Sequence, residues 1–413
     1  MHSGASPAKK MPESKPQTPV KKEHKFKDIL GGKKSRLPKF LSKIFSIGMG
    51  MDMTFLFLVM LLVIIGIIMM YSASYPYALK YGEGSQEYLE SQSRFAFAGV
   101  LIMIGVSYVD YQILKKLSWI IYGIGIILLV AVLFMPGDPK RWIYLGSFSF
   151  QASEVAKFAL VLVLANWSAK HFRKMHTFKV GVFIPALLII AYLGLMVLEP
   201  HYSGIVILGL LGAIMMFIGG VKIRYFVIVG ILGGCVVAYF VLTNQIGYAM
   251  QRLDGWGQAL IYTTKEMWDK TYQTRQSLYA IGSGGAWGLG LGQSRQKYMY
   301  IPEPQNDFIF AVVCEELGFM GAAVIMIIFI LLVWRGMTIA KKIKDPFGCM
   351  LGVGLSAQIG LQAILNVLVI TDWLPNTGIS LPFFSYGGTA LIMQLAEMGI
   401  ILSISRQSNL EKA

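Results

Sequence analysis

The sequence predicts an all-α integral membrane protein with about ten transmembrane helices and one long extracytoplasmic loop between helices 7 and 8. Of its 413 residues, 55% are hydrophobic and 14% are charged, and the mean hydropathy is +0.59. A soluble domain of this composition would be unusual. The apolar residues also gather into runs that can cross a hydrocarbon core of about 30 Å as helices.

Ten such runs follow one another along the chain. They cover residues 53–71, 94–110, 119–136, 153–169, 181–198, 204–220, 225–242, 308–334, 347–370 and 387–404. Residues 243–306 separate the seventh run from the eighth and form the long loop. Together the runs and their connections predict one polytopic membrane domain over residues 51–407, followed by a short C-terminus, 408–413.

Lysine and arginine predict the orientation, because they accumulate on the cytoplasmic side of a membrane protein. They crowd the segment before the first run and recur at 115–116, 170–179, 222–224, 335–344 and 406–412. The short loops on the other side hold only Lys80, Arg94, Lys140 and Arg141. Both termini should therefore be cytoplasmic and the long loop outside. The net charge of +15 reflects this asymmetry, so we expect no nucleic-acid partner.

The N-terminal segment has two parts. Residues 1–34 are rich in Lys, Pro, Ser and Gly and predict a disordered basic cytoplasmic tail. Residues 35–50 carry apolar residues at helical spacing between lysines, which is typical of an amphipathic helix on the membrane surface. The tail either fixes the topology by its charge or also docks cytoplasmic proteins or anionic lipid.

Asp307 starts the eighth run within the stretch "IPEPQNDFIFAVVCEELGF", residues 301–319. An ionisable group at the edge of a membrane span is costly and often functional. A helix N-cap is the alternative, because "QND" before an apolar run is good capping chemistry. From the residues alone, capping and catalysis stand about level.

Other charged and glycine-rich stretches also lie in or beside the spans. Glu154 and Lys157 share a helix face and form either a structural ion pair or a direct substrate contact. Glu315, Glu316 and Glu397 are expected to pack or to form hydrogen bonds between helices. The run "GSGGAWGLGLGQS", residues 282–294, predicts a tight re-entrant turn and no nucleotide loop.

Several motifs resemble those of the SEDS family of membrane proteins, which includes FtsW, RodA and SpoVE. They are "YSAS", "RWI.LG", "Q.SE.AK", "QS..AIGSGG..G.GLG.S.QK", "PE...DFIFA...EELG" and "LPF.SYGG", in this order, between Asp52 and Gln407. The resemblance implies a ten-helix glycosyltransferase of the bacterial cytoplasmic membrane that polymerises lipid II into peptidoglycan on the outer face. It also implies a class B penicillin-binding protein as partner, together with other divisome or elongasome proteins. The basic tail and "MMYSAS" favour an FtsW-like role in division or the related sporulation branch, and a RodA-like role in elongation stays open.

The resemblance places the family's catalytic aspartate on Asp307, which would act as general base on the acceptor sugar hydroxyl. The pyrophosphate leaving group needs Arg, Lys or a divalent cation, Mg²⁺ or Mn²⁺, to neutralise it, and we expect no nucleotide cofactor. The candidate substrate-binding residues are Arg94, Arg141, Glu154, Lys157, Arg252, Arg275, Ser294, Lys297 and Ser385.

Two departures from the family pattern accompany the resemblance. Gln305 and Asn306 stand where the family usually has His-Thr, and His201 stands at a usually acidic position. We expect His201 to be a satisfied polar residue, because no His/Asp cluster accompanies it. Two other functions stay open: a lipid II flippase or transporter, to which intramembrane charges are suited, and a non-catalytic scaffold for the penicillin-binding protein.

Overall fold

The structure is a computed structural model, and it describes residues 50–82, 84, 86–135, 142–145, 148–199, 201–231, 255–261 and 264–410. The chain divides into Met1–Lys43 and Ile44–Ala413, and the first of these units lies wholly outside the described residues. The same holds for the predicted tail 1–34, for nearly all of the predicted surface helix 35–50, and for Arg141 and Arg252.

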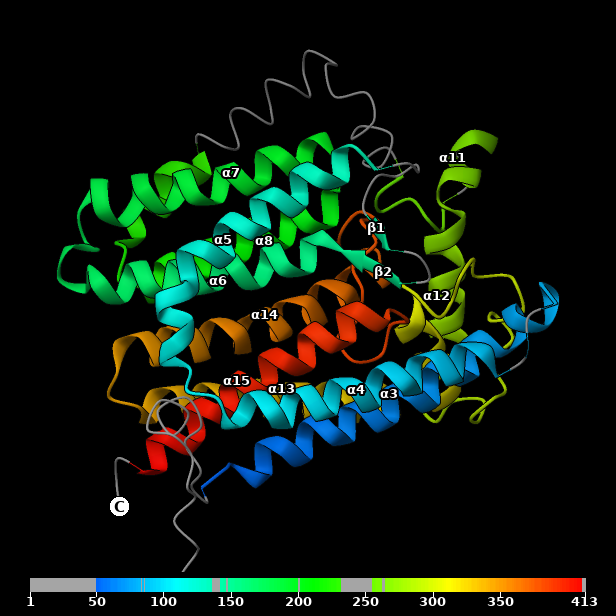
Figure 1. Ribbon diagram of the computed structural model, residues 1–413. Coiled ribbons are helices and arrows are strands. Elements are labelled where there is room, and N and C mark those ends of the chain that lie inside the picture. The colour runs from blue at the N-terminus through cyan, green and yellow to red at the C-terminus, as the bar shows by residue number, and fades with distance from the viewer. Residues whose placement is uncertain are drawn as a thin grey trace, which may run out of the picture. The chain divides into compact units, whose positions relative to one another are not determined.

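Helices dominate the described residues (Figure 1). The long ones are α3 (Met53–Lys80), α4 (Glu87–Tyr108), α5 (Gln112–Leu133), α6 (Ala152–Lys170), α7 (Ile184–Leu198), α8 (Tyr202–Ile218), α13 (Ile309–Lys342), α14 (Pro346–Ile370) and α15 (Gly388–Leu410). The short ones are α11 (Lys265–Lys270), α12 (Tyr272–Gly284), the 3₁₀-helix η1 (Phe172–Lys174) and the π-helix η2 (Phe178–Phe183). Residues 223–231 are also helical.

Nine of the ten predicted runs therefore coincide with helices. In the described part of the chain, eight helices are long and apolar enough to cross a membrane, α7 being counted together with η2, and α8 is a shorter apolar helix. The remaining run, the seventh (225–242), is helical up to residue 231 and then leaves the described residues. The predicted long loop is not purely irregular, because it contains α11 and α12.

Side-chain caps fix where two of the spans begin. The Asp52 carboxylate accepts the Phe55 N–H at 2.9 Å and also binds Arg335 of α13 at 2.7 Å. Asp345 accepts the Gly348 N–H at 2.9 Å at the start of α14, where Pro346 occupies the first turn. Both carboxylates satisfy N–H groups that a helix start leaves unpaired.

A two-stranded ribbon precedes α6 and adds strands to the predicted all-α fold. Strands β1 (Trp142–Leu145) and β2 (Phe148–Gln151) pair antiparallel, with Ile143 opposite Phe150. Aromatic and β-branched residues favour such pairing. Because α6 starts directly after Gln151, the ribbon places that residue at the entrance to the helix.

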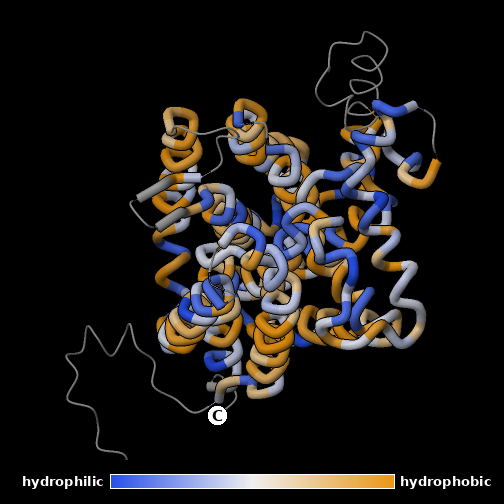
Figure 2. The backbone as a smooth tube through the Cα atoms, turned by 90° about the vertical axis from the view of Figure 1, so that its right-hand side faces the viewer, coloured by the Kyte–Doolittle hydropathy of each residue, from blue (hydrophilic) through white to orange (hydrophobic). Residues whose placement is uncertain are grey.

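Helix α14 lies at the centre of the bundle. It packs against α13 on one side and against α6 and α8 on the other, while α15 runs along α4. In Figure 1 the ribbon β1–β2, α11 and α12 gather at the same end of the helices. Figure 2 looks onto that end, where hydrophilic positions are interspersed among hydrophobic helices.

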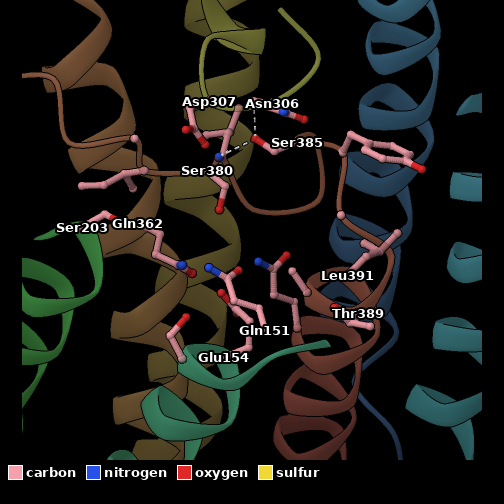
Figure 3. Close-up of a pocket in the computed structure, with 18 of the residues that line it drawn as sticks. Gln151, Glu154, Ser203, Asn306, Asp307, Gln362, Ser380, Ser385, Thr389 and Leu391 are labelled. Carbon is pink, nitrogen blue, oxygen red and sulfur yellow. Dashed lines mark hydrogen bonds between the residues drawn. The ribbon is translucent and has the colours of Figure 1, made fainter. Parts of the chain in front are cut away.

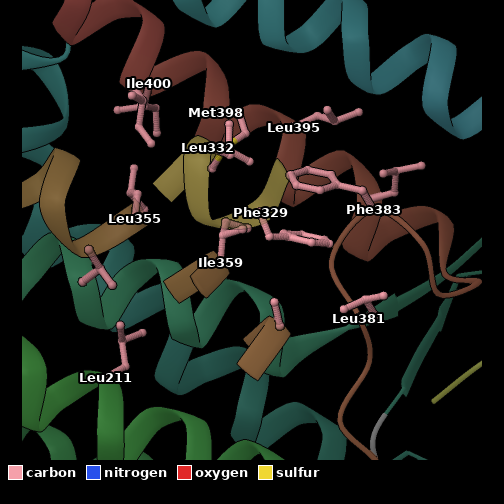
Figure 4. Close-up of a cluster of buried hydrophobic side chains, with 14 of the residues drawn as sticks. Leu211, Phe329, Leu332, Leu355, Ile359, Leu381, Phe383, Leu395, Met398 and Ile400 are labelled. Carbon is pink, nitrogen blue, oxygen red and sulfur yellow. The ribbon is translucent and has the colours of Figure 1, made fainter. Parts of the chain in front are cut away.

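The core and the outer surface are both apolar. Figure 4 shows buried side chains from α8, α13, α14, α15 and the segment before α15, among them Phe329 and Phe383, whose rings stack with centroids 6.4 Å apart. Large hydrophobic side chains also remain on the surface; Phe57, Ile127 and Trp334 are 63%, 66% and 67% exposed. So much exposed apolar surface requires lipid around the helices.

Candidate active site

Asp307 lies two residues before α13, and that helix is interrupted soon after it starts. Gly318 has φ 67° and ψ −175°, so the segment 309–317 does not continue in line with the rest of α13. The N-cap position belongs to Phe308, whose side chain makes no capping hydrogen bond. The capping alternative for Asp307 therefore finds no support in the geometry.

Hydrogen bonds from two other elements hold the backbone at Asp307, and Figure 3 shows the one from Ser385. The Asn366 amide of α14 donates to the Asp307 carbonyl at 2.8 Å and to the Ile379 carbonyl at 2.6 Å. The Ser385 hydroxyl donates to the Asn306 carbonyl at 2.8 Å. The chain before the aspartate is thus fixed between α14 and the segment that precedes α15.

The Asp307 side chain lines a polar pocket of about 580 Å³. Its walls come from α4, β1, β2, α6, α8, α14, α15 and the segment 378–387. Among the predicted site residues, the pocket brings together Asp307, Glu154, Lys157 and Ser385. His201 also lies in its wall and is buried.

Glu154 and Lys157 form a buried ion pair in the pocket wall. The Lys157 Nζ donates to Glu154 Oε1 at 2.8 Å, and both residues are at most 5% exposed. Two charges removed from water require such pairing, because an isolated one is very costly. The geometry is that of the predicted clasp, and its place in the pocket wall also leaves a substrate contact open.

Ser294 and Lys297 lie away from the pocket, in a separate buried network. The Lys297 ammonium binds Glu316 Oε1 at 2.8 Å and donates to the Ser72 hydroxyl of α3 at 3.0 Å. The Ser294 hydroxyl and the N–H groups of residues 295 and 296 donate to Glu315. Ser294 and Lys297 were both predicted to bind substrate. In the structure they join the glycine-rich turn to α13 and α3.

The glycine-rich turn itself replaces helical hydrogen bonds where α13 is interrupted. The Glu315 carbonyl accepts the Leu289 N–H at 2.9 Å, and the Phe319 N–H donates to the Gly285 carbonyl at 2.9 Å. Gly288 and Gly318, both at positive φ, lie back to back, and a Cβ on either would overlap the other's backbone. The predicted tight turn and the predicted hydrogen bonding of Glu315 and Glu316 between segments are confirmed.

Neither described arginine among the candidates lines the pocket. Arg275 is buried on α12, where its guanidinium lies 3.5 Å above the Trp268 ring and donates to the Trp268 carbonyl at 2.8 Å. Arg94 is exposed on α4, about one turn after Ser91 and next to Phe95, which both line the pocket. Arg141 and Arg252 belong to the residues outside the described part of the chain.

The long loop attaches to the end of α14 through Asp372, which has φ 60°. The Trp256 indole N–H donates to the Asp372 carbonyl at 3.2 Å. Burial raises the pKa of the Asp372 carboxyl, while N–H groups of Gly257 and Ala259 act in the opposite direction. This contact keeps the described part of the loop beside the central helix.

Several pocket residues were not singled out from the sequence. They are Gln151, Gln362, Gln394 and Ser380, with Asn366 just behind the wall. A signal was present, because Gln358, Gln362 and Asn366 recur every four residues within an apolar run and so share one helix face. Buried amides at this spacing indicate a polar stripe that faces protein and not lipid.

A metal ion has no ready-made site among the described side chains, since no three His, Cys, Asp or Glu groups are placed to hold one together. The pocket carboxylates Glu154 and Asp307 come from different elements, and Glu154 is already bound to Lys157. We therefore derive no step through a metal.

Fold and pocket together define a polytopic α-helical membrane protein with a carboxylate-bearing polar pocket inside its helix bundle. The family of cell cycle proteins FtsW/RodA/SpoVE matches residues 52–410, and the chain belongs to this family. Stage V sporulation protein E of Bacillus subtilis (strain 168) is 37% identical over 351 residues, which cover 83% of this chain and 93% of that protein. A probable peptidoglycan glycosyltransferase FtsW of Geobacter sp. (strain M18) is 36% identical over 347 residues, 82% of this chain and 92% of that protein.

Solved structures share the fold. A chain from a structure described as the coordination of polymerization and crosslinking by a peptidoglycan synthase complex matches with a TM-score of 0.70 at 24% identity, covering 87% of this chain and 99% of that chain. The rod shape determining protein RodA of Thermus thermophilus matches with a TM-score of 0.62 at 25% identity, covering 87% and 98%. The predicted family and the multi-pass helical fold are confirmed.

Proposed function

We propose that this protein is a peptidoglycan glycosyltransferase that polymerises lipid II, with Asp307 as the general base. The observation that carries the proposal is the position of Asp307, whose carboxylate lines a polar pocket while its backbone is bound by Asn366. The similarity to a probable peptidoglycan glycosyltransferase FtsW over 82% of the chain supports the same activity.

The reaction places one demand on the carboxylate. The acceptor sugar hydroxyl attacks the anomeric carbon of the donor, the new glycosidic bond forms, and the bond to the pyrophosphate breaks with its electron pair on the leaving group. The hydroxyl proton passes to Asp307, which must lie within hydrogen-bond reach of it. Fixing the backbone on both sides keeps the base in place before substrate arrives.

The site faces the outside of the membrane under this proposal. Helices α6 and α13 carry Lys170 and Lys341–Lys342 in their last turns, and the pocket lies toward the opposite ends of these helices, near Glu154 and Asp307. Because basic residues mark the cytoplasmic side, the pocket opens toward the side where peptidoglycan is built. The partner would be a class B penicillin-binding protein, which crosslinks the peptides of the new strand.

Asp307→Asn tests the proposal directly. Asn keeps the size of the side chain but cannot take a proton, so lipid II polymerisation by the purified protein should fall by about 10²–10⁴-fold. Asp307→Ala should be equally inactive, and both variants should still fold, because Phe308 and not Asp307 occupies the N-cap position. The assay compares wild type, both variants and Gln407→Ala, a control whose amide lies at the other end of the bundle and binds Asp110.

Two outcomes would contradict the proposal. If Asp307→Asn polymerised lipid II at the wild-type rate, this carboxylate would have no part in the mechanism. Absence of polymerisation by the wild type, with and without its partner, would favour the scaffold. Lipid II transport in vesicles by a wild type that does not polymerise would favour the flippase.

A further inference from the structure

Gln362 occupies an unusual place in the polar stripe of α14. The stripe consists of Gln358, Gln362 and Asn366, which are 0%, 1% and 0% exposed. Gln358 donates to both oxygens of Glu397 at 2.9 and 3.0 Å, and Asn366 holds the backbone at Asp307. The side-chain oxygens of all three amides accept no hydrogen bond, and of the three residues Gln362 alone lies in the pocket wall. A buried acceptor without a donor destabilises a protein, so folding alone does not explain this amide.

Gln362 lies deeper in the bundle than Asp307. It precedes Asn366 by one helical turn, or about 6 Å along the axis, and Asn366 is bound to the Asp307 carbonyl. Figure 3 shows Gln362 with Gln151 and Glu154 toward one end of the pocket and Asp307 with Ser385 at the other. The pocket thus has an outer part around the carboxylate and an inner part lined with amides.

The charge of the pocket limits what the inner part can hold. Its described lining residues include three carboxylates, Glu154, Glu303 and Asp307, and one ammonium, Lys157, which is already bound to Glu154 at 2.8 Å. A pyrophosphate in the inner part would find the one ammonium already bound to Glu154, and the carboxylates of Glu303 and Asp307 in the same pocket would repel it. A neutral ring with hydroxyl and acetamido groups meets no such repulsion, and it brings N–H and O–H donors for carbonyl oxygens.

Two further amides and a hydroxyl also line the pocket. Gln394 of α15 uses its Oε1 to accept the Phe383 N–H at 3.0 Å, and this hydrogen bond fixes the orientation of its amide. Thr389 and Gln151 line the same pocket from α15 and β2. Amide and hydroxyl groups held by a rigid scaffold are typical of a site that recognises a polar, uncharged ligand by hydrogen bonds.

We propose that the inner part of this pocket is a binding subsite for the uncharged ring of an N-acetylated sugar. The Gln362 Oε1 accepts a hydrogen bond from an acetamido N–H or a ring hydroxyl, and the pyrophosphate of the substrate stays outside this part. The proposal rests on the proposed function, which makes the ligand a lipid-linked amino sugar, and it names the part of that substrate that enters the bundle.

Lipid-free probes test the subsite without requiring catalysis. Di-N-acetylchitobiose carries the acetamido groups without net charge, cellobiose lacks them, and inorganic pyrophosphate carries only the charge. Binding to the purified full-length protein in detergent is measured by ligand-observed NMR. We expect chitobiose to bind about tenfold more tightly than cellobiose, the effect of one good hydrogen bond. Pyrophosphate should not displace it.

Gln362→Met separates recognition from structure. Met has a similar length and no acceptor, so the preference for chitobiose over cellobiose should disappear. The thermal stability should hold or rise, because a buried oxygen without a donor is removed. Gln407→Met, at the end of the bundle where Gln407 binds Asp110, should keep the preference. A structural role for Gln362 predicts instead a lower melting temperature with the preference intact.

Three results would overturn the subsite: equal binding of the two disaccharides by the wild type, an unchanged preference in Gln362→Met, or displacement of chitobiose by pyrophosphate. Lipid II polymerisation is measured separately on the same preparations. Its absence in the wild type would refute the proposed function, whereas polymerisation without the sugar preference would refute the subsite alone.

Discussion

The Asp307 carboxylate lies directly against Gly378. A Cβ on residue 378 would sit 2.8 Å from Asp307 Oδ2, and Gly378 has φ +71°. Only glycine combines this backbone conformation with the space that the carboxylate occupies. The segment before α15 therefore helps to set the position of the aspartate, in addition to the bond from Asn366.

Gly378→Ala should displace the Asp307 carboxylate and lower lipid II polymerisation by about 10²-fold, the effect of moving a catalytic group by about 1 Å. Gly82→Ala is the matched control, because Gly82 has φ +70° and no atom within 4 Å of an added Cβ. Both variants carry the same backbone strain, and only one contacts the carboxylate. Equal losses of activity and equal melting temperatures in the two variants would show that strain alone is responsible.

The ion pair between Glu154 and Lys157 leads to a second prediction. Each partner is nearly inaccessible to water, so removing one leaves a buried charge and should cost about 3–5 kcal/mol. We expect Glu154→Ala and Lys157→Ala to lose more thermal stability and membrane abundance than the double variant. If the losses add, the clasp is refuted and separate contacts with substrate become the better explanation.

Length and hydropathy were enough to predict nearly all the spans, because a membrane helix must be long and apolar. They failed at the end of α3, which was predicted to stop at residue 71 and runs to Lys80. Ser72 and Ser74 lower the hydropathy there, yet both are buried. Ser72 is buried against Glu316 and Lys297, a contact between distant segments that hydropathy does not register.

The site was predicted in part, for similar reasons. The motif around Asp307 identified the carboxylate that lines the pocket. Lys297 was selected for its charge, but the sequence does not show that Glu316, nineteen residues later, is folded back against it at 2.8 Å. Gln362 was missed because it carries no charge and belongs to none of the motifs singled out in the sequence. That Gln362 lines the pocket is evident only from the structure, in which this face of α14 lies in the pocket wall.

The orientation of the membrane domain can be checked with reporter fusions. Fusions after Lys174 and Lys342 should report a cytoplasmic position and a fusion after Gln258 an external one, because Lys and Arg collect on the cytoplasmic side. Alkaline phosphatase and green fluorescent protein, which are active on opposite sides of the membrane, give complementary signals. A cytoplasmic signal at Gln258 would contradict both the predicted topology and an outward-facing pocket.

The pair formed by Lys297 and Glu316 should stabilise the glycine-rich turn, and an exposed pair in the same loop provides a control. Lys270 and Glu266 are also 2.8 Å apart, but their side chains are 32% and 79% exposed, whereas those of Lys297 and Glu316 are 3% and 0% exposed. Lys297→Met should cost about 3–5 kcal/mol, since it leaves Glu316 buried without its counter-charge. Lys270→Met should have no measurable effect, because water screens an exposed pair.

Adding Glu316→Gln to Lys297→Met should restore much of the lost stability, because both buried charges are then gone and Ser72 can still donate to the new side chain. Thermal unfolding in detergent measures all the variants, and lipid II polymerisation is followed in parallel. The segment 309–317 is separated from the rest of α13 at Gly318, so its orientation depends on this network. Activity should therefore fall with stability in Lys297→Met and recover in the double variant. A double variant as unstable as Lys297→Met would mean that the ammonium stabilises the turn through contacts other than Glu316.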